Sequence, residues 1–117
     1  MLKEICLLNG TSGREENVRN YIIDKIKGKC EYSVDALGSI IAFKKGRKLP
    51  SKKVLIAAHM DEVGFIITDI TDDGYLCFAP VGGIDSSVVL GRHVDINGIN
   101  GIIGAKAVHL LTDEEKK

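Results

Sequence analysis

The chain has 117 residues, of which 44% are apolar and 27% are charged, values that suit one small globular domain or a piece of a larger one. Lys and Arg number 16 and Asp and Glu also number 16, so the sequence lacks the basic surplus that nucleic-acid binding requires. The apolar runs are shorter than the ~18–20 residues that cross a bilayer, so we expect no membrane partner either.

Two helices are predicted at the start of the chain. Residues 2–8 have the pattern of a short helix that ends at Asn9-Gly10. Residues 14–27 carry one apolar stripe, which is made by Val18, Ile22 and Ile26 at every fourth position. Thr11-Ser12-Gly13 offers an N-terminal cap for this second helix, and Gly28 ends it.

From residue 31 onward the hydrophobic pattern changes to that of strands. Residues 31–46 predict two short strands on either side of Leu37-Gly38. Residues 54–58 form a continuous apolar run, which is typical of a strand covered on both sides in the centre of an α/β sheet. Residues 63–70 predict a further strand. The first part of the chain is therefore predicted to have an α/β fold.

Near residue 70 the composition shifts toward short β-branched segments separated by glycines. Thr71-Asp72-Asp73-Gly74 is a strong turn signal. Strands are then expected at residues 75–78, 93–96 and 99–108. This rhythm is typical of a small twisted β-barrel or sandwich. We therefore predict a domain boundary here, with residues 1–69 in the first domain and residues 70–117 in the second.

The three cysteines, Cys6, Cys30 and Cys77, are far apart and form no C-x-x-C pair. This number and spacing fit neither a disulfide framework nor a zinc knuckle, so we expect reduced thiols. The first residues lack the pattern of a signal peptide. Together these features predict a soluble, cytoplasmic protein.

Three ionisable residues follow the apolar run, namely His59, Asp61 and Glu62. In an extended chain, residues i and i+2 point to the same side, so His59 and Asp61 are predicted to lie together. A carboxylate that accepts the N–H of one ring nitrogen prepares the other nitrogen to bind a metal. The same spacing is also common in a simple ion pair near solvent. Glu62 points to the opposite side, where it could bond a backbone or a loop.

The remaining candidate sites are weaker. His93 and His109 have the pattern of ordinary strand residues. Gly82-Gly83 lacks the spacing of a phosphate-binding loop, and no Ser-His-Asp or Cys-His arrangement occurs.

Four segments together resemble a known family of peptidases. They are LLNGTSGREENVRNYI, VDALGSIIAFKKG, VLIAAHMDEVGFII and VGGIDSSVVLGRHVDINGINGIIGAKAVHLL, in that order. Their order and spacing resemble those of the glutamyl and deblocking aminopeptidases of peptidase family 42, which include the tetrahedral aminopeptidases. The resemblance covers nearly the whole chain but only the N-terminal third of the family's length.

The resemblance implies a fold, a reaction and a site. Residues 1–69 would be the N-terminal helices and central-sheet strands of an α/β catalytic domain. Residues 70–117 would begin an inserted β-rich lid domain used in dimerisation, so a homo-oligomer is expected. His59 would bind one of two divalent metal ions, zinc or cobalt, and Asp61 would orient that ligand. The substrate would be a peptide that loses its N-terminal residue.

Two local departures from the family pattern occur. Ser39 stands where the family often has Asn, and Gly10-Thr11-Ser12-Gly13 replaces its usual G-P-S-G. Neither change falls on a metal ligand.

A larger departure is that the family's other metal ligands and its general base lie beyond the matched part. Glu114-Glu115 is an adjacent acidic pair, but its charged surroundings do not match those of the catalytic pair. A dinuclear hydrolase needs a bridging carboxylate, an activated water and a base. We therefore expect this chain alone to be inactive and to bind metal weakly or not at all.

Two other functions are considered. The chain could be a non-catalytic, self-associating β-rich assembly module, because unpaired sheet edges and apolar surface invite association. A glycosidase would require two carboxylates about 5–9 Å apart across a cleft, and the sequence indicates no such pair.

Overall fold

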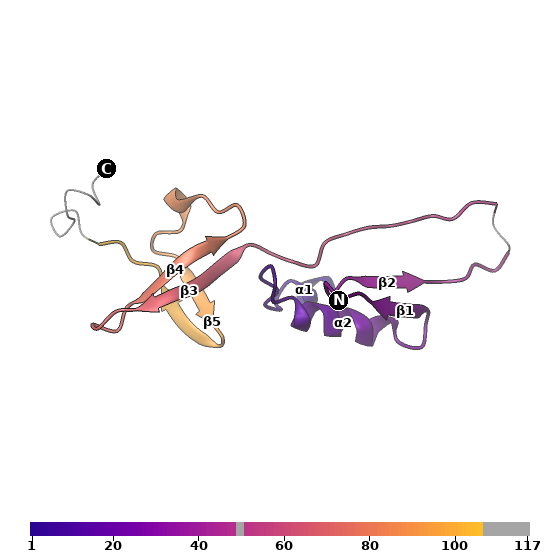
Figure 1. Ribbon diagram of the computed structural model, residues 1–117, viewed down its shortest axis with the longest axis horizontal. Coiled ribbons are helices and arrows are strands. Elements are labelled where there is room, and N and C mark those ends of the chain that lie inside the picture. Colours follow the sequence, from indigo (N-terminus) through magenta and orange to yellow (C-terminus); the bar gives the residue numbers. More distant parts are fainter. Residues whose placement is uncertain (49–50, 107–117) are drawn as a thin grey trace. The chain divides into compact units, whose positions relative to one another are not determined.

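The computed structural model describes residues 1–48 and 51–106 and contains both helices and strands (Figure 1). The elements in chain order are α1 (Leu2–Ile5), α2 (Glu16–Ile26), β1 (Glu31–Val34), β2 (Ile40–Phe43), β3 (Gly64–Ile70), β4 (Leu76–Val81), the 3-10 helix η1 (Ser86–Val88), β5 (His93–Ile96) and β6 (Ile99–Ile102). The strands of the described residues form three two-stranded antiparallel sheets, β1–β2, β3–β4 and β5–β6. The chain divides into two compact units, Met1–Gly83 and Ile84–Lys117.

Both predicted helices are present, and each is shorter than expected. The apolar stripe of α2 turns Val18 inward, where its side chain is only 5% exposed. Gly28 follows the helix with a φ of 74°, a left-handed conformation that ends helices and that glycine adopts at little cost. The predicted cap is wrong, because the N-cap residue is Glu15 rather than a residue of the 11–13 segment.

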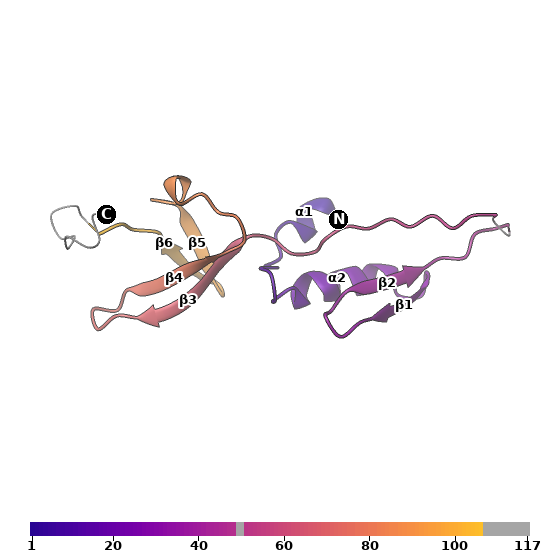
Figure 2. The same ribbon diagram turned by 45° about the horizontal axis from the view of Figure 1, so that its top comes forward.

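The β1–β2 hairpin confirms the two strands predicted around Leu37-Gly38. Its turn is held by the Asp35 carboxylate, whose Oδ1 accepts the backbone N–H groups of Leu37 at 2.9 Å and Ser39 at 2.8 Å. Gly38 has a φ of 90°, which explains the glycine in this turn. Helix α2 runs alongside this hairpin in both views (Figures 1 and 2).

The central-sheet strand predicted at residues 54–58 is wrong. This run is extended, but within residues 1–48 and 51–106 it pairs with no strand. Its side chains are open to solvent, with Val54, Leu55 and Ile56 exposed by 88%, 91% and 89%. The physical reason is that apolar character alone does not make a strand. A strand also needs a neighbour whose backbone N–H and C=O groups complete its hydrogen bonds.

The β3–β4 hairpin confirms the strand predicted at residues 63–70 and the turn after it. The hydroxyl of Thr71 accepts the backbone N–H of Tyr75 at 3.0 Å, and Gly74 has a φ of 82°. Phe65 and Phe78 pack edge to face across the hairpin, with ring centroids 4.9 Å apart. The domain boundary predicted near residue 70 lies at the end of β3, which pairs with β4. The two compact units instead divide after Gly83.

The second unit contains the β5–β6 hairpin. Its turn has positive φ angles at Asn97 (51°) and Gly98 (89°), as a tight two-residue hairpin turn requires. Ile103 follows β6 and is 7% exposed, held by backbone hydrogen bonds from Gly91 N to its carbonyl and from its own N–H to Arg92 O. Of the strand predicted at residues 99–108, positions 99–102 are confirmed as β6. His109 and Glu114-Glu115 lie outside the described residues.

Across the described ranges, neither helix combines the length and the apolar character that a membrane span would need.

Candidate functional site

The segment that carries the candidate site is held in place by the N-terminal loop. Glu62 forms an isolated parallel bridge with Thr11. Its N–H donates to Gly10 O at 2.9 Å, and its carbonyl accepts the N–H of Ser12 at 3.3 Å. The carboxylate of Glu62 accepts the N–H of Gly10 at 3.1 Å. The prediction that Glu62 bonds a backbone or a loop is therefore confirmed.

Gly10 permits this close approach. A Cβ atom added at this position would lie 2.7 Å from Cγ2 of Val18 and 3.4 Å from the carbonyl oxygen of Met60. Val18 is a buried side chain of α2, so it has little room to move away. A glycine at this position therefore lets the N-terminal loop, α2 and the 59–62 segment meet.

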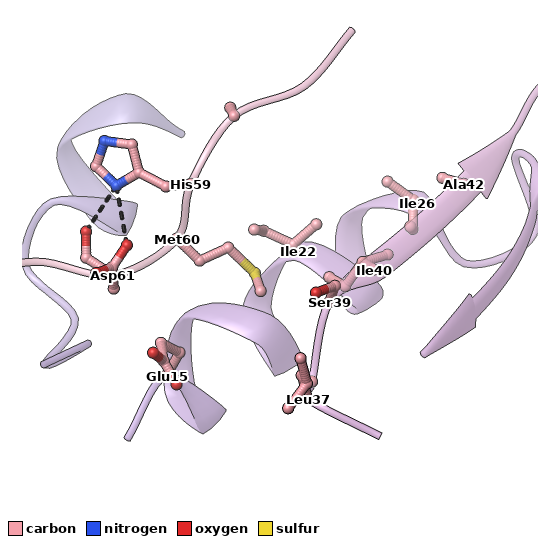
Figure 3. A pocket seen from close by; sticks show the side chains of 12 residues that line it. Glu15, Ile22, Ile26, Leu37, Ser39, Ile40, Ala42, His59, Met60 and Asp61 are labelled. Atoms are coloured by element: carbon pink, nitrogen blue, oxygen red, sulfur yellow. Dashed lines mark hydrogen bonds and ion pairs between the residues drawn. The ribbon is translucent and has the colours of Figure 1, made fainter. Parts of the chain in front are cut away.

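His59 and Asp61 are in contact, as the spacing predicted. Nδ1 of His59 lies 2.9 Å from the carbonyl oxygen of Asp61 and 3.1 Å from its Oδ1 (Figure 3). A backbone carbonyl and an ionised carboxylate only accept hydrogen bonds, so Nδ1 must be the nitrogen that carries the proton. The neutral ring then has its lone pair on Nε2, the atom available to a metal ion.

The carboxylate of Asp61 has a second partner that the sequence did not indicate. The hydroxyl of Ser12 donates to Oδ2 of Asp61 at 2.6 Å. This bond is the largest cause that lowers the pKa of Asp61 below its ordinary value of 3.8, and the neighbouring His59 adds to the effect. The serine in the G-x-S-G segment could have suggested this role, but its position before a helix favoured a cap.

The site is open to solvent on the side of the histidine. The side chain of His59 is 85% exposed and that of Asp61 is 42% exposed. Met60, between them in the chain, extends the other way toward Ile22 of α2 (Figure 3). A hollow of about 450 Å³ lies there, lined by His59, Asp61 and mainly apolar side chains from α2 and β2.

The donor atoms suit one ligand position rather than a complete metal centre. Among the described residues, no group of three or more His, Cys, Asp or Glu side chains could hold a metal ion. A zinc ion usually takes four ligands, and the Nε2 atom of His59 can be one of them. An imidazole whose Nδ1–H is held by a carboxylate fits such a position chemically.

Comparisons with known proteins point to one family. Residues 38–117 match the family described as M42 glutamyl aminopeptidase. A putative aminopeptidase from Acetivibrio thermocellus is 44% identical over 107 residues, which cover 90% of this chain and 31% of that protein.

Solved structures are also similar to this chain. The crystal structure of an endoglucanase from Thermotoga maritima is 44% identical with a TM-score of 0.83, covering 91% of this chain and 34% of that one. The TET1 peptidase of Pyrococcus horikoshii is 42% identical with a TM-score of 0.75, covering 99% of this chain and 36% of that one.

This chain therefore spans about a third of the length of the relatives it matches. Because the family match extends over residues 38–117, which is more than half of the chain, this protein belongs to the M42 glutamyl aminopeptidase family of enzymes.

Proposed function

We propose that this chain supplies the first metal ligand of an aminopeptidase that removes N-terminal residues from peptides. The single observation that supports this role is the contact of His59 Nδ1 with Asp61, which directs the exposed Nε2 lone pair outward in a member of a peptidase family. In this proposal His59 binds the metal, and Asp61 fixes the tautomer and the direction of the ring.

The chemistry of the complete enzyme would come from two divalent ions, zinc or cobalt, which polarise the scissile carbonyl and activate water. The residues of this chain prepare and position the metal ligand. Asp61 keeps the proton on Nδ1, and the 10–12 loop holds the 59–62 segment against α2 through Glu62. One imidazole and one orienting carboxylate do not provide a bridging ligand or a general base. We therefore propose that the chain is inactive alone.

Metal binding tests the role of His59 directly. Cobalt(II) added to the purified chain is expected to bind weakly, and His59→Ala should abolish that binding. His93→Ala is the matched control, because His93 is an exposed histidine in β5 of the other unit. The absorption spectrum of bound cobalt reports the coordination. Equal cobalt binding by the two variants would reject His59 as a ligand.

Turnover tests the proposed inactivity. The purified chain with zinc or cobalt is expected to release negligible nitroaniline from an aminoacyl-nitroanilide. Turnover that His59→Ala abolishes would show that the chain is a working peptidase by itself.

The same family membership supports a proposal on domains and assembly. We assign residues 1–69 to the catalytic domain and residues 70–117 to the start of the lid domain, in a cytoplasmic protein. The TET1 peptidase of Pyrococcus horikoshii can assemble into a tetrahedron or an octahedral shell. Self-association of this chain through its β-rich part is therefore proposed, and it is also the non-catalytic alternative. Light scattering would test it, since a monomer at all concentrations contradicts it.

A glycosidase function is not proposed. Glycoside hydrolysis needs two carboxylates that face a scissile bond. The two carboxylates at this site already have partners inside the protein: Asp61 accepts from Ser12 and contacts His59, while Glu62 accepts from Gly10. Both groups thus serve to hold the site together.

A further inference from the structure

We propose that Ser12 is a positioning residue that acts on His59 through Asp61. The inference rests on the proposed role of His59 as a metal ligand and adds the residue that prepares it. The observation behind it is a chain of two contacts, from the Ser12 hydroxyl to Asp61 Oδ2 at 2.6 Å and from Asp61 Oδ1 to His59 Nδ1 at 3.1 Å.

The two oxygens of the Asp61 carboxylate have different partners, and this sets the plane of the group. Oδ2 accepts the Ser12 hydroxyl, so Oδ1 is left facing the imidazole. The Asp61 side chain is 42% exposed. Without the bond to Ser12, an exposed carboxylate can rotate about its terminal torsion, which has a broad energy well. Ser12 thus selects the rotamer in which Oδ1 meets Nδ1.

The Ser12 hydroxyl can select this rotamer because the backbone of Ser12 is itself held by hydrogen bonds. Ser12 N donates to Glu62 O at 3.3 Å, and Arg14 N donates to Thr11 O at 2.8 Å. Gly13 adopts a φ of 84°, which turns the chain sharply after Ser12. The loop therefore forms hydrogen bonds with two successive residues, with the side chain of Asp61 and with the backbone of Glu62.

The consequence concerns the tautomer of the ring. A histidine without an acceptor at Nδ1 populates both neutral tautomers, and only the one protonated on Nδ1 leaves Nε2 as a ligand. The carbonyl of Asp61 also accepts at Nδ1, at 2.9 Å, so loss of the carboxylate should weaken the preference rather than abolish it. The net effect of one such hydrogen bond is roughly a two- to tenfold change in the tautomer ratio.

Nitrogen-15 NMR of the imidazole measures this ratio in the metal-free chain, at a pH where the ring is neutral. Ser12→Ala is expected to lower the ratio of Nδ1–H to Nε2–H in His59 by roughly two- to tenfold. Ser12→Thr keeps the hydroxyl and should restore the ratio. Ser87→Ala is the matched control, because it removes a similar bond, from Ser87 Oγ to Asp85 Oδ1 at 2.7 Å, in the other unit.

An unchanged ratio in Ser12→Ala, or an equal shift in Ser87→Ala, would overturn the proposal. If Ser12→Ala does not fold, Ser12→Cys replaces it, since a thiol is nearly the same shape but a weaker donor. An unchanged ratio in Ser12→Cys would then overturn the proposal in the same way. The cobalt titration of His59→Ala is a separate measurement, so a failed metal role and a failed role for Ser12 are distinguishable.

Discussion

Gly10 shows how much of this site depends on the absence of one methyl group. Its N–H and C=O both bond Glu62, while its missing side chain leaves room for Val18 and for the backbone of Met60. The residue therefore brings together the N-terminal loop, α2 and the 59–62 segment, the last of which is about 50 residues away in sequence. Glycine is required at this position by the close approach of its neighbours and not by its backbone conformation, because Gly10 does not adopt a positive φ angle.

We predict that Gly10→Ala destabilises the chain by about 1–3 kcal/mol, because the new Cβ would lie 2.7 Å from Val18 Cγ2. Denaturant unfolding measures the loss. Gly83→Ala is the matched control, since a Cβ there meets nothing within 4 Å. Equal midpoints for the two variants would contradict the packing argument.

At the scale of elements, the short helix α1 is attached to α2 by a polar contact. The hydroxyl of Tyr21 donates to Glu4 Oε2 at 2.6 Å, and Lys25 lies 3.8 Å from the same oxygen. The bond to the Glu4 carboxylate raises the pKa of Tyr21 from 10.0 to about 12. The Tyr21 hydroxyl in turn is the main cause that lowers the pKa of Glu4 below 4.5. A four-residue helix cannot stabilise itself, so this contact helps to hold it.

The sign of each shift gives the pH range of this contact. Tyr21 has a raised pKa, so its contribution is complete below pH 10.0 and is lost as the pH rises through about 12. Glu4 has a lowered pKa, so its contribution is complete above pH 4.5 and is lost as the pH falls through the lowered value.

We expect Glu4→Ala to bring the Tyr21 titration back toward 10.0, measured by the ultraviolet absorbance of tyrosinate. Tyr21→Phe assigns the signal by removing it, and an unmoved midpoint in Glu4→Ala would contradict the prediction.

At the scale of the whole molecule, many large apolar side chains among the described residues are exposed. The side chains of Val54, Leu55 and Ile56, for example, are exposed by 88%, 91% and 89%. Val18 and Ile103 are the buried hydrophobic residues among those that the structure describes. Surface of this kind favours association with other protein surface.

We expect the 54–56 segment, which pairs with no strand among the described residues, to contribute to self-association in addition to the β-rich part. Ile56→Lys should raise the concentration needed for association by about tenfold or more, since it removes a large apolar side chain from the contact. It should leave the unfolding free energy nearly unchanged, because Ile56 is 89% exposed. Sedimentation of a dilution series measures the association. Leu37→Lys is the control. Leu37 is 92% exposed, but it lies in a hairpin turn and its own backbone N–H already donates to Asp35. An unchanged distribution for Ile56→Lys would exclude the segment from the contact.

Local signals in the sequence determined the elements whose partners are close in the chain. The stripe of α2 and the turn segments Leu37-Gly38 and Thr71-Asp72-Asp73-Gly74 predicted one helix and two hairpins, because helix contacts and tight turns involve residues only a few positions apart. The contact of His59 with Asp61 follows from the same kind of local geometry, since the two residues are two positions apart in an extended segment.

Only the tertiary structure decided the rest. The bond from Ser12 to Asp61 joins residues 49 positions apart, and that from Gly10 to Glu62 joins residues 52 apart. No local pattern in the sequence encodes such pairings. For the same reason the apolar run at residues 54–58 misled the prediction. Its composition is that of a buried strand, but a strand forms only where another segment completes its hydrogen bonds, and none of the described segments does so.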